Sequence, residues 1–307
     1  MNIKKIMMAA IFLSPLSVLA CDICGCGVGS YYIGILPEYN KRFMGLRYQH
    51  KNLQTHLGPQ GNTTPLTTDE TYQTAELWGG WNFGKKFRAL AFVPYNFNKR
   101  SSQASLGDKD GLGDIALMGY YNLFTSSSTL SRKLMVQSFW LGAGIKLPTG
   151  KYEASERLAV QETPNNFQLG TASTDFTINA AYDVRLNDLG FNVNANYKLN
   201  TSNKYEYRYG NKFTTNALFY YKFRLFHKLT LAPNAGLLYE TAAKDVENDK
   251  YEMDVSGGYS TAVITGFELA MSKFSLGANY QNVVSQQLAN QRAKAGNRLM
   301  LHISVPF

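Results

Sequence analysis

The chain has 307 residues, of which 45% are apolar when tyrosine and cysteine are counted, 13% are aromatic and 17% are charged, and its formal net charge is +9. A mean hydropathy of −0.25 is too low for a bundle of transmembrane helices, and abundant aromatic residues with charges of both signs exclude a disordered chain. The charged fraction lies below the roughly one quarter that is usual in soluble domains, and 20 Tyr, 18 Phe and 26 Gly favour a protein of many strands.

Residues 1–20 have the features of an export signal. Lys4 and Lys5 precede a short apolar core, and Val18 and Ala20 stand three and one residues before a cleavage site after Ala20. The apolar core is too short to remain as a helical span, which needs about 20 residues. We therefore predict a signal peptide over 1–20, export from the cytoplasm, and a mature chain that begins at Cys21.

All three cysteines follow at once, in a segment over 21–39 that we expect to be periplasmic. Cys21, Cys24 and Cys26 form a C-x-x-C-x-C pattern, and thiolates of this kind suit Cu(I) or Zn. An oxidising compartment equally favours a local disulfide, and a cysteine directly after the signal also suits lipidation of Cys21. Metal binding, a disulfide and a lipid anchor therefore remain open. The chain has no C-x-x-C-H haem motif, and no other cofactor is indicated.

Alternating residues, rather than helical patterns, fill the rest of the chain. In 191–199 the odd positions are apolar or aromatic and the even positions are Asn or Lys, and 213–223 and 298–307 repeat this pattern. Successive side chains of a strand point to opposite faces, so each segment has an apolar face and a polar face. No run of about 18 uncharged apolar residues follows residue 20, so a helical span is not predicted.

Twelve strands are expected, over 41–53, 70–83, 86–98, 111–124, 133–147, 167–185, 189–201, 205–223, 228–241, 255–270, 273–284 and 296–307. Short connections at 84–85, 187–188, 225–227 and 271–272 alternate with long ones near 54–69, 99–110, 148–166, 242–254 and 285–295. This alternation is typical of outer-membrane barrels with short periplasmic turns. The predicted fold is all-β: a transmembrane up-and-down antiparallel β-barrel of about 12 strands over 40–307. An even strand count places both termini in the periplasm.

A secreted β-sandwich or a lipocalin-like barrel is the soluble alternative. Aromatic residues near the ends of the apolar faces favour the membrane, where they form interfacial girdles. A final strand that ends at Phe307 resembles the assembly signal of outer-membrane barrels, which makes the barrel-assembly machinery an expected partner. Isolated charges on the polar faces also favour a wet lumen over a dry core.

The charges that we expect to line the lumen and to set its selectivity are Arg47, Glu76, Arg88, Asp114, Lys146, Asp175, Asp183 and Arg185. The same face is assigned to Lys198, Lys222, Glu240, Glu268 and Arg298.

Three short motifs carry a family resemblance. Residues 111–114 read GLGD, 147–150 read LPTG, and 169–175 fit LGT-x-S-x-D. Their order and spacing resemble the family named for the MetA pathway of phenol degradation, often labelled outer-membrane transporter-like. The resemblance implies an outer-membrane β-barrel whose substrate is poorly defined. From the residues themselves, Asp114 and Asp175 are expected to pair with Arg88, Lys146 or Arg185, as a structural charge ladder rather than as a selective constriction.

An enzyme is not expected, because the four histidines are scattered and no serine partner can be assigned to any of them. The positive charge is too dispersed for nucleic acid and instead suits lipopolysaccharide or a lumen that prefers anions. Three hypotheses follow: a channel or transporter for small organic molecules or other small solutes, a barrel that binds copper or zinc through its cysteines, and a structural barrel that interacts through its loops. The expected partners are outer-membrane lipid, lipopolysaccharide and the solute, and the expected location is the outer membrane of a Gram-negative cell.

Overall fold

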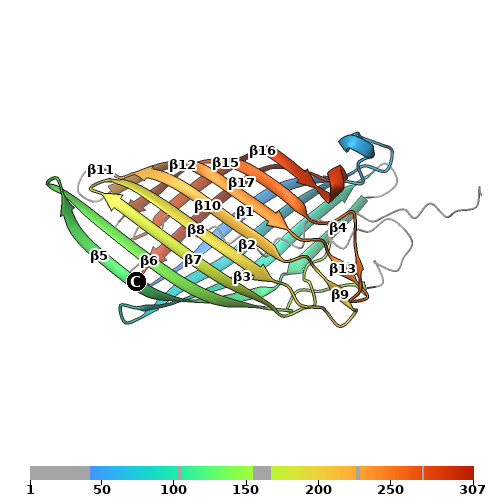
Figure 1. The fold of residues 1–307 in the computed structure, drawn as a ribbon, viewed down its shortest axis with the longest axis horizontal. Helices are drawn as coiled ribbons and strands as arrows, with labels where there is room; N and C mark the ends of the chain where they lie inside the picture. Colours follow the sequence, from blue (N-terminus) through green and yellow to red (C-terminus); the bar gives the residue numbers. More distant parts are fainter. Residues whose placement is uncertain (1–41, 103–105, 155–166, 226–228, 272) are drawn as a thin grey trace, which may run out of the picture.

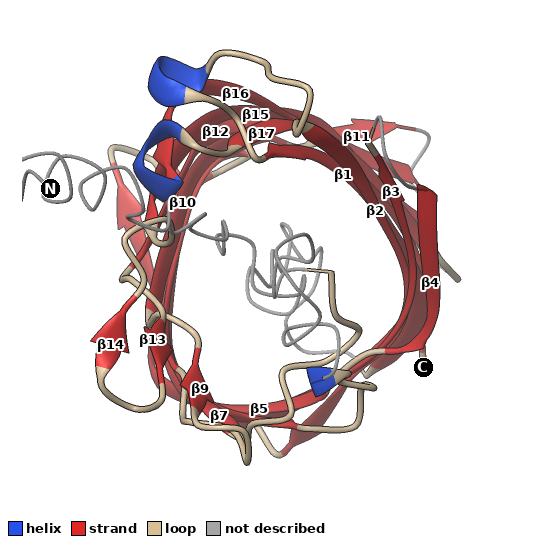
Figure 2. Cartoon of the chain, turned by 90° about the vertical axis from the view of Figure 1, so that its right-hand side faces the viewer, coloured by secondary structure: helices blue, strands red, loops and turns tan. Residues whose placement is uncertain are grey.

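The computed structural model describes residues 42–102, 106–154, 167–225, 229–271 and 273–307. These residues form one antiparallel sheet that closes on itself through the pairing of β10 with β12 (Figures 1 and 2). The fourteen segments of this sheet make twelve barrel strands, because β4 and β5 follow one another along β3, and β10 and β11 follow one another along β12. The fold prediction is therefore confirmed. Among the described residues, no helix has the length and apolar content needed to cross a bilayer.

The strands of the barrel are β1 (Phe43–Thr55), β2 (Thr68–Phe83), β3 (Phe87–Ser101), β4 (Leu106–Leu112), β5 (Ile115–Leu130), β6 (Lys133–Leu147), β7 (Asp175–Leu186), β8 (Leu189–Leu199), β10 (Lys212–Tyr221), β11 (Phe223–Leu225), β12 (Leu229–Ala242), β15 (Gly258–Met271), β16 (Ser275–Leu288) and β17 (Lys294–Pro306). A small separate sheet joins β9 (Tyr207–Arg208), β13 (Val246–Glu247) and β14 (Tyr251–Glu252), and two short 3-10 turns are η2 (Pro59–Gly61) and η3 (Ala289–Gln291).

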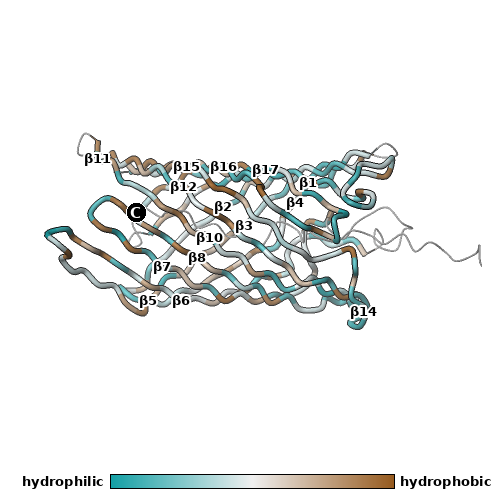
Figure 3. Tube along the Cα trace, turned by 45° about the horizontal axis from the view of Figure 1, so that its top comes forward, coloured by the Kyte–Doolittle hydropathy of each residue, from teal (hydrophilic) through white to brown (hydrophobic). Residues whose placement is uncertain are grey.

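Hydrophobic and hydrophilic residues alternate along the barrel strands (Figure 3), and the exposure of their side chains shows that the two sets lie on opposite sides of the wall. In β17 the side chains of Leu299, Leu301, Ile303 and Val305 are exposed on the outside, whereas Met300, on the opposite parity, is buried. In β8 Asn192 is buried and Tyr197 is exposed. The outward side chains are apolar, and the closed sheet pairs the backbone along most of the wall. The wall therefore suits a lipid environment, in which an unpaired backbone group is costly.

The two ends of the barrel differ. The connections 84–86, 131–132 and 187–188 are tight and lie at the same end as Phe307, which we call the short-turn end. The connections 56–67, 200–211 and 243–257, and the described residues 148–154 and 167–174 of the connection between β6 and β7, lie at the other, long-loop end (Figure 1). Outward aromatic pairs mark the short-turn end, with the ring centroids of Trp81 and Phe307 5.7 Å apart and those of Phe87 and Tyr121 4.9 Å apart.

Several predicted boundaries are wrong. The segment 99–110, expected to be a loop, is mostly strand, since β3 continues to Ser101 and β4 begins at Leu106. The strand expected over 167–185 begins only at Asp175, and the strand expected over 205–223 is divided between β9, β10 and β11. The long connection expected at 285–295 shortens to 289–293 because β16 continues to Leu288. In each case, contacts with distant segments override the local pattern.

Toward the short-turn end, the interior of the barrel is more apolar than the polar lumen that the sequence predicts. Trp78, Phe92, Met118 and Trp140 point inward from β2, β3, β5 and β6 and belong to one buried cluster. The rings of Trp78 and Phe92 stack with their centroids 6.4 Å apart. The β1–β6 side of the barrel interior is therefore packed at this end.

Candidate functional site

The three sequence motifs meet in space inside the wall. Asp114 lies in the break between β4 and β5, and Lys146, Asp175 and Lys198 come from the end of β6, the start of β7 and the end of β8. All four side chains are buried. The Lys146 Nζ atom lies 2.6 Å from Asp114 Oδ2 and 2.8 Å from Asp175 Oδ2. The Lys198 Nζ atom lies 3.3 Å from the same Asp175 oxygen. We call these four residues the inner clamp; two carboxylates and two ammonium groups balance its charge.

Loop backbone completes the clamp around Asp114. Gly150 N–H donates to Asp114 Oδ1 over 2.9 Å, and Thr171 N–H donates to Oδ2 over 2.9 Å. The Thr171 hydroxyl also donates to Oδ2, over 3.0 Å. These bonds pull the connection between β6 and β7 onto the break between β4 and β5. Residues 169–174 therefore form a loop rather than the first part of a strand.

Asp175 is fixed in the same way. The Ser173 hydroxyl donates to Asp175 Oδ1 over 2.9 Å, and Thr201 N–H donates to the same oxygen over 3.1 Å. Asn203 Nδ2 donates to the carbonyl of Thr171 over 3.0 Å, so the connection after β8 also joins the group. A buried ion pair is favourable only when its remaining polar atoms are bonded, and the loops supply those bonds.

The LPTG motif bridges the strand break. Ile115 N–H donates to Thr149 Oγ1 over 2.9 Å, and the same hydroxyl donates to the carbonyl of Gly113 over 2.8 Å. One side chain thus satisfies two backbone groups that the interrupted sheet would leave unpaired.

The close packing of the loop requires glycine at position 170. A Cβ added there would lie 2.6 Å from the Gly150 carbonyl oxygen and closer still to Asp114 Oδ1.

A second group of predicted residues lies nearer the short-turn end. Arg47 and Glu76, cross-strand partners on β1 and β2, form a buried ion pair. The Arg47 guanidinium lies 5.3 Å from the ring centroid of Trp78, and that of Arg88 lies 5.4 Å from the ring of Phe43. These three charges are packed among aromatic rings and contribute to the closed part of the interior.

Asp183 and Arg185 lie on β7, and the structure does not bring them to the clamp. Asp183 accepts a hydrogen bond from the Tyr220 hydroxyl over 3.0 Å and from Asn192 Nδ2 over 3.4 Å. Of the three cations predicted as alternative partners of Asp114 and Asp175, Lys146 contacts both carboxylates, so that alternative is confirmed. The selectivity role of all eight predicted residues stays a prediction.

An open cavity occupies the opposite side of the barrel. Its empty space is about 1790 Å³ when the part open to solvent is included. Its polar lining is dominated by amides and hydroxyls on β7, β8, β10 and β15, among them Asn179, Asn194, Asn196, Asn216, Thr214 and Ser260. Among its charged lining residues are Lys51, Lys198, Lys212, Arg298, Glu240 and Asp245.

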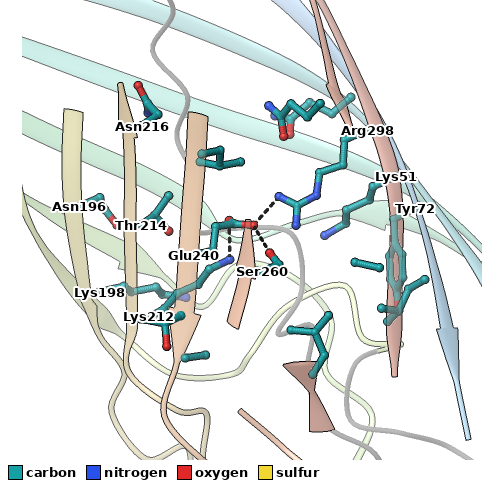
Figure 4. A pocket seen from close by; sticks show the side chains of 18 of the residues that line it. Lys51, Tyr72, Asn196, Lys198, Lys212, Thr214, Asn216, Glu240, Ser260 and Arg298 are labelled. Atoms are coloured by element: carbon teal, nitrogen blue, oxygen red, sulfur yellow. Dashed lines mark hydrogen bonds and ion pairs between the residues drawn. The ribbon is translucent and has the colours of Figure 1, made fainter. Parts of the chain in front are cut away.

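Glu240 lies at the centre of this lining, between cations from two sides (Figure 4). Its Oε1 lies 3.0 Å from Lys212 Nζ, and its Oε2 lies 2.5 Å from Arg298 Nη1. Lys51 lies beside Arg298, with its Nζ 5.0 Å from the ring centroid of Tyr72. We call Lys51, Lys212, Glu240 and Arg298 the cavity cluster. Three cations and one carboxylate give it a charge of +2.

Sequence reasoning placed Glu240 and Arg298 on the polar face but singled out neither, and it missed Lys212. Lys212 could have been predicted to face the lumen, because it lies two and four residues before Thr214 and Asn216, which are on the polar face of the same strand. What the sequence does not reveal is that Lys212 on β10 and Arg298 on β17 both meet the Glu240 carboxylate on β12.

Cys21, Cys24 and Cys26 lie outside the described residues, so their predicted metal, disulfide or lipid chemistry stays a prediction. Among the residues that the structure describes, no group of three or more His, Cys, Asp or Glu side chains is placed to hold a metal ion.

Solved structures similar to this chain are outer-membrane barrels. The COG4313 outer membrane channel from Pseudomonas putida F1 has 14% sequence identity and a TM-score of 0.59, with 96% of this chain and 100% of that chain covered. The beta domain of the Bordetella autotransporter Brka has 12% identity and a TM-score of 0.50, with 87% of this chain and 100% of that chain covered. At these identities the likeness shows the fold. No curated protein matches the chain.

The family described as "Putative MetA-pathway of phenol degradation" matches residues 50–295. This span contains the three motifs, the inner clamp and most of the barrel strands. The chain is a member of that family.

Proposed function

We propose that this protein is an outer-membrane channel or transporter that carries small organic molecules or other small solutes through its lumen. The observation that supports this most is the open, amide-lined cavity inside a closed wall whose outer surface is apolar. Such a cavity offers hydrogen bonds to a solute while the wall excludes lipid. In the membrane, the short-turn end with Phe307 would face the periplasm, as in other barrels of this kind.

Location and fold can be tested together. Cell fractionation should recover the protein with the outer membrane, and the unheated protein should migrate faster on a detergent gel than the heated one. Recovery in a soluble fraction without detergent would contradict the proposal.

Conductance in planar lipid bilayers tests the channel. The refolded protein should give discrete current steps, and swelling of proteoliposomes should report entry of small neutral solutes. Heat-unfolded protein at the same concentration is the control. A folded barrel without steps or swelling would instead favour the structural alternative, in which the loops bind partners.

Copper or zinc binding is the second candidate, and it rests on the C-x-x-C-x-C sequence alone. Titration of the reduced full chain with Zn²⁺ should give one equivalent more than titration of a variant in which Cys21, Cys24 and Cys26 are all serine. Equal stoichiometry in the two proteins would remove the metal hypothesis and leave the disulfide and lipid alternatives.

A further inference from the structure

The cavity lining holds like charges side by side. In the register of the sheet, Lys212 on β10 lies directly opposite Lys198 on β8. Lys51 on β1 likewise lies directly opposite Arg298 on β17. Like charges in directly opposed positions destabilise a sheet. Two such pairs on one cavity therefore favour a role that requires positive potential.

The carboxylates nearby offset this charge only in part. Lys198 binds Asp175 in the inner clamp. Asp245, the other acid on the lining, accepts hydrogen bonds from the Tyr207 hydroxyl and Gly210 N–H, each over 2.6 Å. Glu240 is thus the carboxylate that meets both Lys212 and Arg298, and one negative charge faces two cations at 3.0 and 2.5 Å.

An apolar surface adjoins these cations. Leu238 precedes Glu240 by two residues on β12, and Met300 follows Arg298 by two residues on β17, so both point inward one step closer to the short-turn end. Both line the cavity and belong to a buried cluster with Leu218, Tyr220 and Ile264. A molecule seated here would have cations at one end and aliphatic side chains at the other.

We propose that the cavity cluster binds the carboxylate of a small amphipathic organic anion, with the head group between Lys212 and Arg298 and the apolar body against Leu238 and Met300. This assignment rests on the proposed channel function and names the class of solute that the lumen selects. Glu240 acts as a built-in counterion that occupies the cation pair until a solute carboxylate competes for it. A charge-assisted hydrogen bond from each cation would hold the head group.

Binding of hexanoate to the full-length protein in lipid nanodiscs tests the site, with hexanamide as the uncharged analogue of the same length. Saturation-transfer NMR should give at least about tenfold weaker binding for hexanamide, as expected for the loss of charged hydrogen bonds. Lys212→Gln and Arg298→Gln should each weaken hexanoate binding by roughly five- to tenfold. Lys109→Gln, which removes a cation from an ion pair with Glu153 away from the cavity lining, is the matched control and should bind as the unmodified protein does.

The Glu240→Gln variant should change the affinity for hexanoate in the opposite direction. Loss of the internal competitor should strengthen hexanoate binding, and a variant that merely misfolds cannot gain affinity. Equal binding of hexanoate and hexanamide, or no change in any of the three cluster variants, would overturn the assignment.

The same preparations separate this proposal from the channel. Current steps without selective hexanoate binding would leave the channel standing and remove the anion site. Selective hexanoate binding without current steps or swelling would keep the site and remove the channel.

Discussion

The inner clamp and the cavity cluster are both built from acidic and basic side chains on the same inner wall, and Lys198 of the clamp and Lys212 of the cluster are cross-strand neighbours. In the clamp, backbone N–H groups of Gly150, Thr171 and Thr201 bind the carboxylates, and the loops exclude solvent. In the cluster, the side chains of Lys212 and Arg298 keep 31% and 20% of their surface exposed to the cavity. The contrast teaches that a charge on a barrel's inner face is structural when loop backbone closes over it, and available to a solute when it does not.

The largest expected effect comes from breaking the clamp. Lys146→Met leaves Asp114 and Asp175 as two buried carboxylates without their shared cation, and removing one partner of a buried ion pair costs about 3–5 kcal/mol. Urea unfolding of the refolded protein measures this loss. Lys212→Met is the matched control in the cluster and should cost about 1 kcal/mol or less, because Arg298 remains and solvent reaches the site. Equal losses in the two variants would erase the distinction between the two groups.

A backbone substitution tests the closeness of the loop. Gly170→Ala places a Cβ against Asp114 and 2.6 Å from the Gly150 carbonyl oxygen, and overpacking of this kind costs about 1–3 kcal/mol. Gly119→Ala, whose Cβ would meet Ala143 O at 4.0 Å, should unfold at the same urea concentration as the unmodified protein. A stable Gly170→Ala protein would mean that the loop does not hold Asp114 as tightly as the geometry indicates.

Ion selectivity tests whether the cavity cluster, unlike the inner clamp, faces the path of ions. Glu240→Gln removes the one carboxylate of the cavity cluster, so the ratio of chloride to potassium permeability should rise by roughly two- to fivefold. Reversal potentials across a salt gradient in planar bilayers give this ratio. Glu153→Gln, at a carboxylate outside the cavity lining, should leave it unchanged. A ratio that falls in the Glu240 variant would contradict the placement of Glu240 in the conducting path.

The smallest effect concerns an exposed pair in the loop before β15. The hydrogen bond and charge of Lys244, 2.6 Å away, lower the pKa of Asp254 from its usual 3.8. A lowered pKa means that the pair's contribution to stability is present above about pH 4 and is lost as the pH falls through the folded pKa. The gap in unfolding midpoint between the unmodified protein and Asp254→Asn should therefore be small at pH 7 and shrink as the pH falls below about 4. A difference in unfolding midpoint that grows as the pH falls would contradict a lowered pKa of Asp254.

Much of the wall could be predicted because its signal is local. A strand places every second residue on one face, so lipid on one side and a polar interior on the other are visible in nine residues such as 191–199. The sequence predicted only part of the inner clamp. Asp114 and Asp175 lie in recognised motifs, and Lys146 directly precedes one. That Lys146 joins the two carboxylates, and that Thr149 bridges the strand break, depends on loops that return from distant positions.

The sequence by itself determined the strand pattern, the face of each charge and the family, because alternation, parity and short motifs are properties of neighbouring residues. The tertiary structure alone decided which charges are covered and which face the cavity, because burial depends on which loop packs over a strand end. It also decided that Lys212, Glu240 and Arg298 share one place, because the pairing of β10 with β12 and the strand order β12, β15, β16, β17 bring together residues that lie far apart along the chain.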